Sequence, residues 1–128
     1  MKSRSAKAKG RRLQQEVQQK LLESFPGILE DDDVKVAIMG ESGVDIELSP
    51  LARKHIPYSI ECKNTEKIAV WQALKQATEN TREGTEPAVV FRRNNSETYA
   101  IIRFEHLVEL MRREKCPSPH LTSLEPFT

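Results

Sequence analysis

The chain has 128 residues, of which 38% are hydrophobic and 30% charged, and its 20 basic and 19 acidic side chains give a net charge of +1. This length fits one domain and is too short for two, and no apolar run approaches the roughly 18 residues that a membrane helix needs. The two cysteines, Cys62 and Cys116, cannot form a disulfide framework and match no zinc spacing. We therefore expect an intracellular, reducing location, namely the cytoplasm.

The charge is distributed unevenly along the chain. Residues 1–12 carry six basic side chains and no acidic one, which leaves residues 13–128 with 14 basic and 19 acidic side chains. The six are Lys2, Arg4, Lys7, Lys9, Arg11 and Arg12. A basic arm on an acidic body indicates contact with a polyanion, although a solvated tail or an organellar targeting peptide would have the same composition. We divide the chain into a basic arm (1–12), one domain (13–115) and an irregular, proline-containing tail (116–128).

The first predicted element is a helix. Leu13, Val17 and Leu21 recur every four residues and predict a helix that begins within the arm and ends near Ser24. The acidic run 30–33 follows it. Because this run lacks alternating ligands, we expect a solvated loop there and not a calcium site.

The rest of the chain predicts five strands and two further helices, so the element order is α-β-β-β-α-β-β-α. The strands are predicted over residues 34–39, 44–49, 57–63, 88–93 and 98–103, and the helices over 66–82 and from 104 to before Pro117. A turn is expected at 40–43, a loop at 50–56, and Thr65 is the expected N-cap of helix 66–82. This alternation is typical of an α/β fold with a mixed central sheet flanked by helices.

Strand periodicity places two carboxylates and an amine together. Side chains alternate between the two faces of a strand, so Asp45 points away from the apolar face of strand 44–49. On strand 57–63, Glu61 and Lys63 point away from the apolar face that carries Cys62, which we expect in the core. If the strands pair, Asp45, Glu61 and Lys63 meet on one polar face. Mg²⁺ prefers oxygen ligands and takes one or two carboxylates, and a nearby lysine stabilises charge that builds on a phosphate, so this set is suited to phosphodiester hydrolysis.

Asp45, followed after 15 residues by Glu61-Cys62-Lys63, resembles the PD-(D/E)xK nuclease superfamily, and the predicted element order is similar to its restriction-endonuclease-like αβββαββ core. Among its members, those of the Holliday-junction-resolvase type and phage endonucleases are most similar to this chain. In these relatives a glutamate on the first helix often completes the metal site, and Glu16 is the matching residue. The resemblance covers roughly residues 8–105.

This resemblance implies a metal-dependent DNA endonuclease, an Mg²⁺-dependent endodeoxyribonuclease in which Mn²⁺ can substitute. Glu16, Asp45 and Glu61 would bind the metal, and Lys63 would assist the attacking water. The implied substrate is branched DNA of the Holliday-junction type, or DNA that the enzyme nicks. A homodimer is expected, because symmetric cleavage of a two-fold junction needs two active sites. A non-catalytic nucleic-acid-binding protein with the same fold is the alternative, and these residues do not separate DNA from RNA.

Other polar and aromatic residues receive secondary interpretations. Related nucleases often carry a glutamine near the site on the helix after the ExK strand, where Gln72 and Gln76 lie here. The residues expected to bind the DNA backbone are Lys7, Lys9, Arg11, Arg12, Arg53 and Lys54, with Arg82, Arg92 and Arg93 as further candidates. We expect His55 and His106 to be surface or structural residues, and Trp71 to pack in the core.

Overall fold

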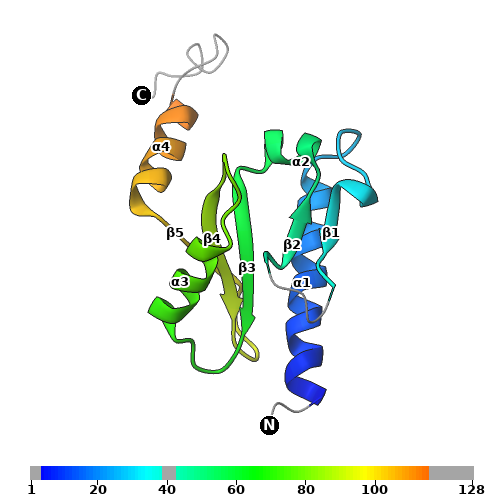
Figure 1. The fold of residues 1–128 in the computed structure, drawn as a ribbon, viewed down its shortest axis with the longest axis vertical. Helices are drawn as coiled ribbons and strands as arrows, with labels where there is room; N and C mark the ends of the chain where they lie inside the picture. The colour runs from blue at the N-terminus through cyan, green and yellow to red at the C-terminus, as the bar shows by residue number, and fades with distance from the viewer. Residues whose placement is uncertain (1–3, 39–42, 116–128) are drawn as a thin grey trace.

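The computed structural model describes residues 4–38 and 43–115, which form a mixed α/β fold with four α-helices and two sheets (Figure 1). In chain order the elements are α1 (Arg4–Ser24), the 3-10 turn η1 (Asp31–Asp33), β1 (Val34–Val36), β2 (Ile46–Leu48), α2 (Pro50–His55), β3 (Tyr58–Asn64), α3 (Val70–Glu79), β4 (Glu86–Arg92), β5 (Tyr99–Ile102) and α4 (Phe104–Lys115). Most of the predicted turn 40–43, the tail 116–128 and Cys116 lie outside the described residues.

The two sheets meet beside Asp45. β1 and β2 form an antiparallel pair, whereas β3 pairs in parallel with β4, and β4 pairs antiparallel with β5. The parallel pair needs a crossover connection, which α3 supplies. The backbone N–H of Asp45, directly before β2, donates to the carbonyl oxygen of Ile60 in β3 at 3.1 Å. The start of β2 is thereby fixed against the middle of β3.

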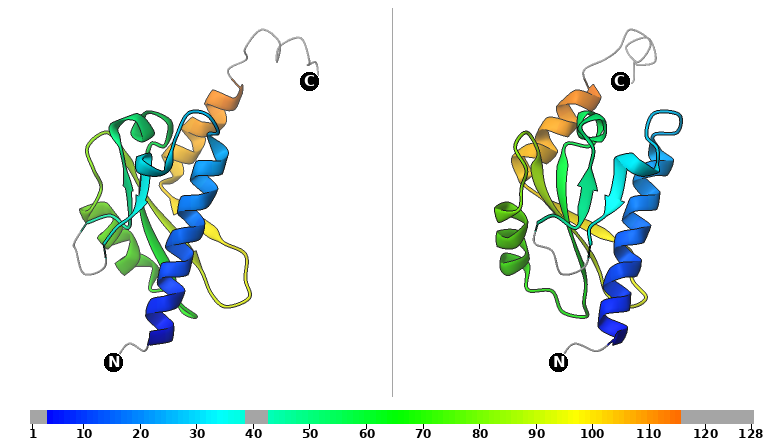
Figure 2. Two further views of the ribbon diagram at one scale, coloured as in Figure 1. Left: turned by 90° about the vertical axis from the view of Figure 1, so that its right-hand side faces the viewer. Right: turned by 45° about the vertical axis from the view of Figure 1, so that its right-hand side comes forward.

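Helices α1 and α3 cover opposite faces of the three-stranded sheet (Figures 1 and 2). On the α1 face, Leu13 packs with Ile60 and Cys62 in the larger core cluster. On the α3 face, Ala73 and Ala77 pack with Val89 of β4 and its neighbours. Burial of both faces agrees with the parallel pairing of β3 and β4. The predicted alternation along β3 is confirmed, because Ile60 and Cys62 lie on the apolar α1 face.

Residues 50–55 form helix α2, and the prediction of a loop there was wrong. The Ser49 hydroxyl accepts a hydrogen bond from the backbone N–H of Ala52 at 3.0 Å, and Pro50 occupies the first helical position. A serine N-cap followed by proline is a typical helix start, because proline lacks the N–H that this position leaves unpaired. Arg53 and Lys54 consequently lie in the last turn of a short helix.

Helix α3 begins at Val70, four residues later than predicted, with Ala69 and not Thr65 as its N-cap. The backbone N–H of Thr65 donates to the carbonyl oxygen of Arg92 at 3.2 Å. Thr65 therefore prolongs the hydrogen bonding between β3 and β4, and its hydroxyl donates to the Lys67 carbonyl oxygen at 3.0 Å instead of capping a helix. The acidic run also differs from the predicted loop, since residues 31–33 form η1.

The exposed aromatic residues correct one interpretation. Trp71 is 82% exposed on α3, so the prediction that it packs in the core was wrong. The buried face of α3 is formed by Ala73 and Ala77, which are small enough to let the helix approach the sheet closely. α4 projects from one end of the sheet (Figure 1) and leaves Phe104 73% exposed. In the part of the chain that the structure describes, no helix is long and apolar enough to cross a membrane.

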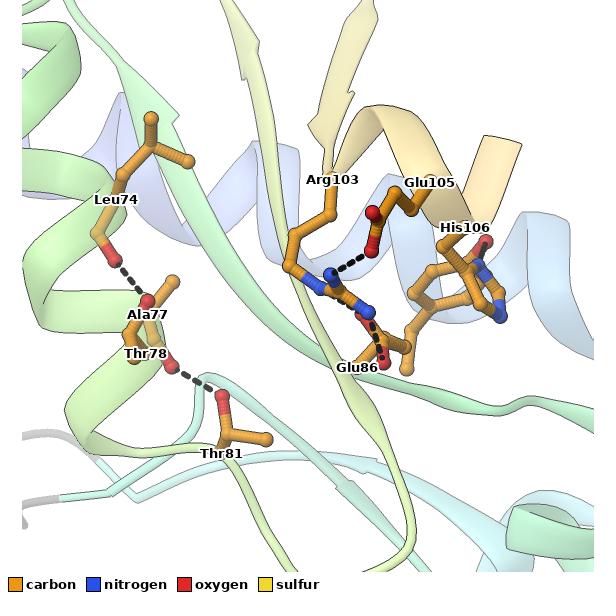
Figure 3. A network of polar contacts seen from close by, with 9 residues as sticks. Leu74, Ala77, Thr78, Thr81, Glu86, Arg103, Glu105 and His106 are labelled. Carbon is orange, nitrogen blue, oxygen red and sulfur yellow. Dashed lines mark hydrogen bonds and ion pairs between the residues drawn. The ribbon is translucent and has the colours of Figure 1, made fainter. Parts of the chain in front are cut away.

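Polar contacts attach the start of α4 to the sheet. The Arg103 guanidinium donates two hydrogen bonds to the Glu86 carboxylate, at 2.7 and 3.0 Å, and one to Glu105 (Figure 3). His106 is buried, and its Nδ1 lies 2.7 Å from the Tyr58 hydroxyl oxygen. His106 is therefore a structural residue, as expected from the sequence.

Candidate metal centre

Asp45 is held against β3 by two hydrogen bonds. Besides the backbone bond to Ile60, its carboxylate Oδ2 accepts from the backbone N–H of Cys62 at 2.7 Å. Gly43, two residues before Asp45, has a φ of 118°, a value that favours glycine. These bonds to positions 60 and 62 flank Glu61, so the Asp45 carboxylate is fixed next to that residue.

Glu61 is a buried carboxyl group with an unpaired oxygen. It lies in the middle of β3 and points to the α3 face, and its side chain is only 4% exposed. Among the described residues, Glu61 Oε1 is the one buried side-chain oxygen or nitrogen without a hydrogen-bond partner. Leaving such an atom unpaired costs about 1–3 kcal/mol. A structure accepts that cost most readily where the atom has a partner that the protein does not itself supply.

Lys63 connects Glu61 to α3. Its Nζ lies 3.9 Å from Glu61 Oε2 and donates a 3.0 Å hydrogen bond to Gln76 Oε1. A pocket of about 310 Å³ opens here, and Lys63, Gln72 and Gln76 are among its lining residues. The structure therefore brings Asp45, Glu61 and Lys63 together. Gln76 contacts Lys63 and Gln72 lines the same pocket as Lys63, whereas Asp45 and Glu61 do not line that pocket.

The two carboxyl groups affect each other's protonation. Burial, followed by the charge of Asp45, raises the pKa of Glu61 from its ordinary value of 4.5 to about 7, and the nearby Lys63 opposes this rise. Burial also raises the pKa of Asp45, against the lowering effects of the Cys62 N–H and Lys63. Two adjacent carboxyl groups in a buried site resist ionising together. The pair therefore retains one proton as long as the pH is below about 7, and a cation that displaced this proton would let both groups ionise.

Glu16 lies elsewhere. The Arg92 guanidinium donates hydrogen bonds to both Glu16 carboxylate oxygens, one of them at 3.0 Å, and these bonds lower the pKa of Glu16. The structure thus places Glu16 beside Arg92. The resemblance implied instead that Glu16 would lie with Asp45 and Glu61. The α1 side chain that lies near enough to lower the pKa of Asp45 is Gln14. Positions 14 and 16 lie about 200° apart around a helix, so both cannot face the same strand.

Two residues near the site were missed by the sequence interpretation. Gln14 follows the fully buried Leu13, and no sequence signal marks it as a neighbour of Asp45. Asn80 lies near enough to the Glu61 carboxyl group to lower its pKa, and a signal for it does exist. Gln72 and Gln76 on α3 and Asn80, the C-cap of α3, are spaced four residues apart, so they form one polar stripe along one side of this helix.

The donor set suits a hard divalent cation. Within residues 4–38 and 43–115, no group of three or more histidine, cysteine, aspartate or glutamate side chains could hold a metal. The site thus offers two carboxylates, one with an unpaired oxygen. Mg²⁺ is commonly held by one or two carboxylates, with water and substrate phosphate completing its coordination. Asp45 and Glu61 fit this pattern, whereas zinc sites are built mainly from histidine and cysteine ligands, which do not accompany these two carboxylates in the described part of the chain.

The residues expected to bind DNA occupy two separate regions. Lys7, Lys9, Arg11 and Arg12 lie in the first half of α1, which is a continuous helix from Arg4. α2, which carries Arg53 and Lys54, lies toward the opposite end of the molecule (Figure 1). The Arg53 guanidinium donates to the Leu48 carbonyl oxygen at 2.9 Å and so has a structural contact. His55 is exposed, with its ring 5.5 Å from that of Phe25.

Comparison of the chain with known protein families, with curated proteins and with solved structures finds no significant match.

Proposed function

We propose that this protein is a metal-dependent DNA endonuclease of the PD-(D/E)xK type, in which Asp45 and Glu61 bind Mg²⁺. The observation that carries the proposal is the buried Glu61 carboxyl group, which has an unpaired oxygen, lies next to Asp45 and is 3.9 Å from Lys63 Nζ. The order α1, β1, β2, β3, α3, β4, β5 supports it, with α2 as an addition between β2 and β3. Mn²⁺ is proposed to substitute for Mg²⁺.

Each residue has a distinct task in this proposal. Bound Mg²⁺ would supply a Lewis acid that activates water and neutralises charge on the phosphate. Asp45 and Glu61 supply the oxygen ligands, and Glu61 gives up its proton when the cation binds. The Lys63 ammonium, held by Gln76 at 3.0 Å, stabilises negative charge on the phosphate as water attacks phosphorus and the P–O bond to the leaving strand breaks. The proton that the attacking water loses is balanced by the proton that the leaving oxygen gains. Gln76 is a positioning residue because it acts through Lys63.

The substrate and assembly rest on the resemblance. Branched DNA of the Holliday-junction type is the proposed substrate, and a homodimer is the proposed assembly. The exposed Phe104, Leu107 and Met111 of α4 offer apolar surface for a two-fold contact. Sedimentation at micromolar concentration, with and without junction DNA, tests the dimer, and a monomer under both conditions would contradict it.

A non-catalytic nucleic-acid-binding protein is the second candidate, and one observation favours it. Glu16 is engaged by Arg92, which leaves two carboxylates at the site where the resemblance implied three. This candidate predicts DNA binding without strand cleavage.

A substrate panel separates the two candidates. The wild-type protein is incubated with a four-way junction, a flap, a linear duplex, single-stranded DNA and single-stranded RNA, with either Mg²⁺ or EDTA. The nuclease proposal predicts cleavage of at least one DNA substrate with Mg²⁺ and none with EDTA. Binding to these DNAs without cleavage in either metal condition would favour the second candidate.

A further inference from the structure

A second polar pocket lies where the first half of α1 meets the loop between β4 and β5. Figure 2 shows this loop, in yellow, beside the N-terminal half of α1. The pocket encloses about 190 Å³, and four cations line it: Lys9, Arg12, Arg92 and Arg93. Its lining residues include no aspartate or glutamate. Four cations from two distant parts of the sequence are therefore concentrated at one concave surface.

The fold holds both sides of this pocket in place. The Asn64 side chain, at the end of β3, donates a 3.1 Å hydrogen bond to the Lys9 carbonyl oxygen in α1. Asn64 is also the register partner of Arg92 in β4. The first turns of α1 are thus attached to the sheet beside Arg92, so Lys9 and Arg12 are presented from a fixed helix and not from a free arm.

The turn after β4 is fixed as well. The backbone N–H of Asn94 donates to the Glu66 carboxylate at 2.7 Å, and the backbone N–H of Arg93 donates to the Ser96 hydroxyl at 3.1 Å. Asn95 has φ of 59°, in the left-handed region that asparagine tolerates. These contacts define the path of the backbone that carries Arg93.

The cations outnumber their carboxylate partners. Arg92 forms an ion pair with Glu16, whereas Lys9, Arg12 and Arg93 form none within the described residues. Glu16 also holds the Arg92 side chain, which is only 18% exposed, against the pocket wall. Cations gathered in a concave site create a positive potential that attracts anions. Arginine adds planar donor pairs that match the oxygens of a phosphate.

We infer that this pocket binds a phosphate of a nucleic-acid backbone at a point away from the bond that is cleaved. The choice of nucleic acid as the ligand rests on the proposed function, whereas the concentration of positive charge in the pocket is a feature of the structure itself. Asn64 contacts α1, and the adjacent Lys63 contacts α3. The pocket therefore lies on the α1 face at the end of β3. The candidate metal centre lies on the α3 face, with Glu61 in the middle of the strand and Lys63 near the end that carries the pocket. A nucleic acid that contacts both sites passes around the end of β3, and its phosphate contacts fix its position without reading sequence.

The test compares the DNA binding of a variant that lacks two cations of the pocket with that of a variant that lacks two cations elsewhere. Arg12→Gln/Arg93→Gln changes two exposed cations, and Lys35→Gln/Arg113→Gln is the control, because those two are also exposed and do not line the pocket. Binding of a fluorescent DNA duplex is measured by anisotropy in EDTA over a range of salt concentrations. We expect affinity near 0.1 M salt to fall about eightfold for each pocket cation removed, and the slope of log K against log salt to flatten by about two. The control should change both quantities much less.

Two further arms identify the ligand and guard against misfolding. Arg12→Lys/Arg93→Lys keeps the charge and should retain most of the salt slope. Inorganic phosphate is titrated into the wild type and into Arg12→Gln/Arg93→Gln. The inference would be overturned if Arg12→Gln/Arg93→Gln and the control had equal DNA affinity and salt slope. Loss of phosphate binding by Arg12→Gln/Arg93→Gln with unchanged DNA affinity would also overturn it. Because binding is measured in EDTA, failure of Mg²⁺-dependent cleavage by the wild type would contradict the proposed nuclease function without altering this result.

Discussion

Replacing Glu61 by glutamine should stabilise the metal-free protein at alkaline pH. The glutamate side chain is 4% exposed and lies beside Asp45, so its ionised form is disfavoured in the folded state. Below pH 4.5 the folded and unfolded states both keep the Glu61 proton, and no penalty arises. As pH rises from 4.5 toward 7, the unfolded state loses this proton first, so the free energy of unfolding falls. Glutamine has nearly the same shape and does not ionise.

The magnitude follows from the pKa of Glu61. A rise from 4.5 to about 7 corresponds to about 3 kcal/mol of stability lost once the pH exceeds the folded-state value. Glu61→Gln should therefore be more stable than wild type by up to about 3 kcal/mol at pH 8, in EDTA, and should differ little from it near pH 4. Added Mg²⁺ should stabilise the wild type and not the variant, because a ligand stabilises only the state that binds it.

Urea unfolding followed by circular dichroism, at several pH values with EDTA or Mg²⁺, measures these differences. Glu47→Gln is the matched control, because Glu47 is an exposed carboxylate on β2, two residues after Asp45. The reasoning would be refuted if Glu61→Gln were less stable than wild type at pH 8 in EDTA. A stability difference that did not change between pH 4 and pH 8 would refute it equally.

Three other substitutions separate the remaining roles. Lys63→Ala should keep Mn²⁺ binding, measured by calorimetry, while the single-turnover cleavage rate falls at least about tenfold; an unchanged rate would remove Lys63 from the mechanism. Cys62→Ser should lose about 1–3 kcal/mol of stability in urea unfolding, because it places a hydroxyl in the apolar α1 face. It should cleave DNA at the wild-type rate, and slower cleavage by the folded variant would contradict the assigned faces of β3. Glu16→Gln should tighten DNA binding in EDTA, because Arg92 loses its competing carboxylate. If Glu16→Gln instead lost as much cleavage activity as Glu61→Gln, Glu16 would be a metal ligand.

The alternation of β3 was predictable because one of its faces carries apolar residues and the other carries polar residues. Ile60 and Cys62 pack toward α1, which leaves Glu61 and Lys63 on the α3 face. A shift of the strand by one residue would bury Lys63 in the larger core, so the hydrophobic pattern alone fixes the arrangement. The meeting of Asp45 with Glu61 follows from this pattern once β2 lies beside β3.

The placement of Glu16 could not be predicted from its position on α1. Its partner, Arg92, lies 76 residues away in sequence, and the apolar stripe of α1 does not show which strand each flank of the helix meets. Trp71 was misplaced for a related reason. The α3 helix has apolar residues on more than one side, and the side that faces the sheet is the one with the small residues Ala73 and Ala77. Close packing against β4 selects that side, and large side chains at those positions would not fit.

The single-turnover rate of DNA cleavage by wild type, Glu61→Gln and Glu47→Gln tests the central claim most directly. Each protein is mixed in excess with the DNA substrate that the wild type cleaves, in the presence of Mg²⁺, and circular dichroism confirms that each is folded. The account predicts that Glu61→Gln loses about a hundredfold or more in rate, because a neutral amide is a much poorer ligand for Mg²⁺ than a carboxylate. Glu47→Gln should match the wild type. Cleavage by folded Glu61→Gln at the wild-type rate would contradict the assignment of this carboxylate to the metal centre.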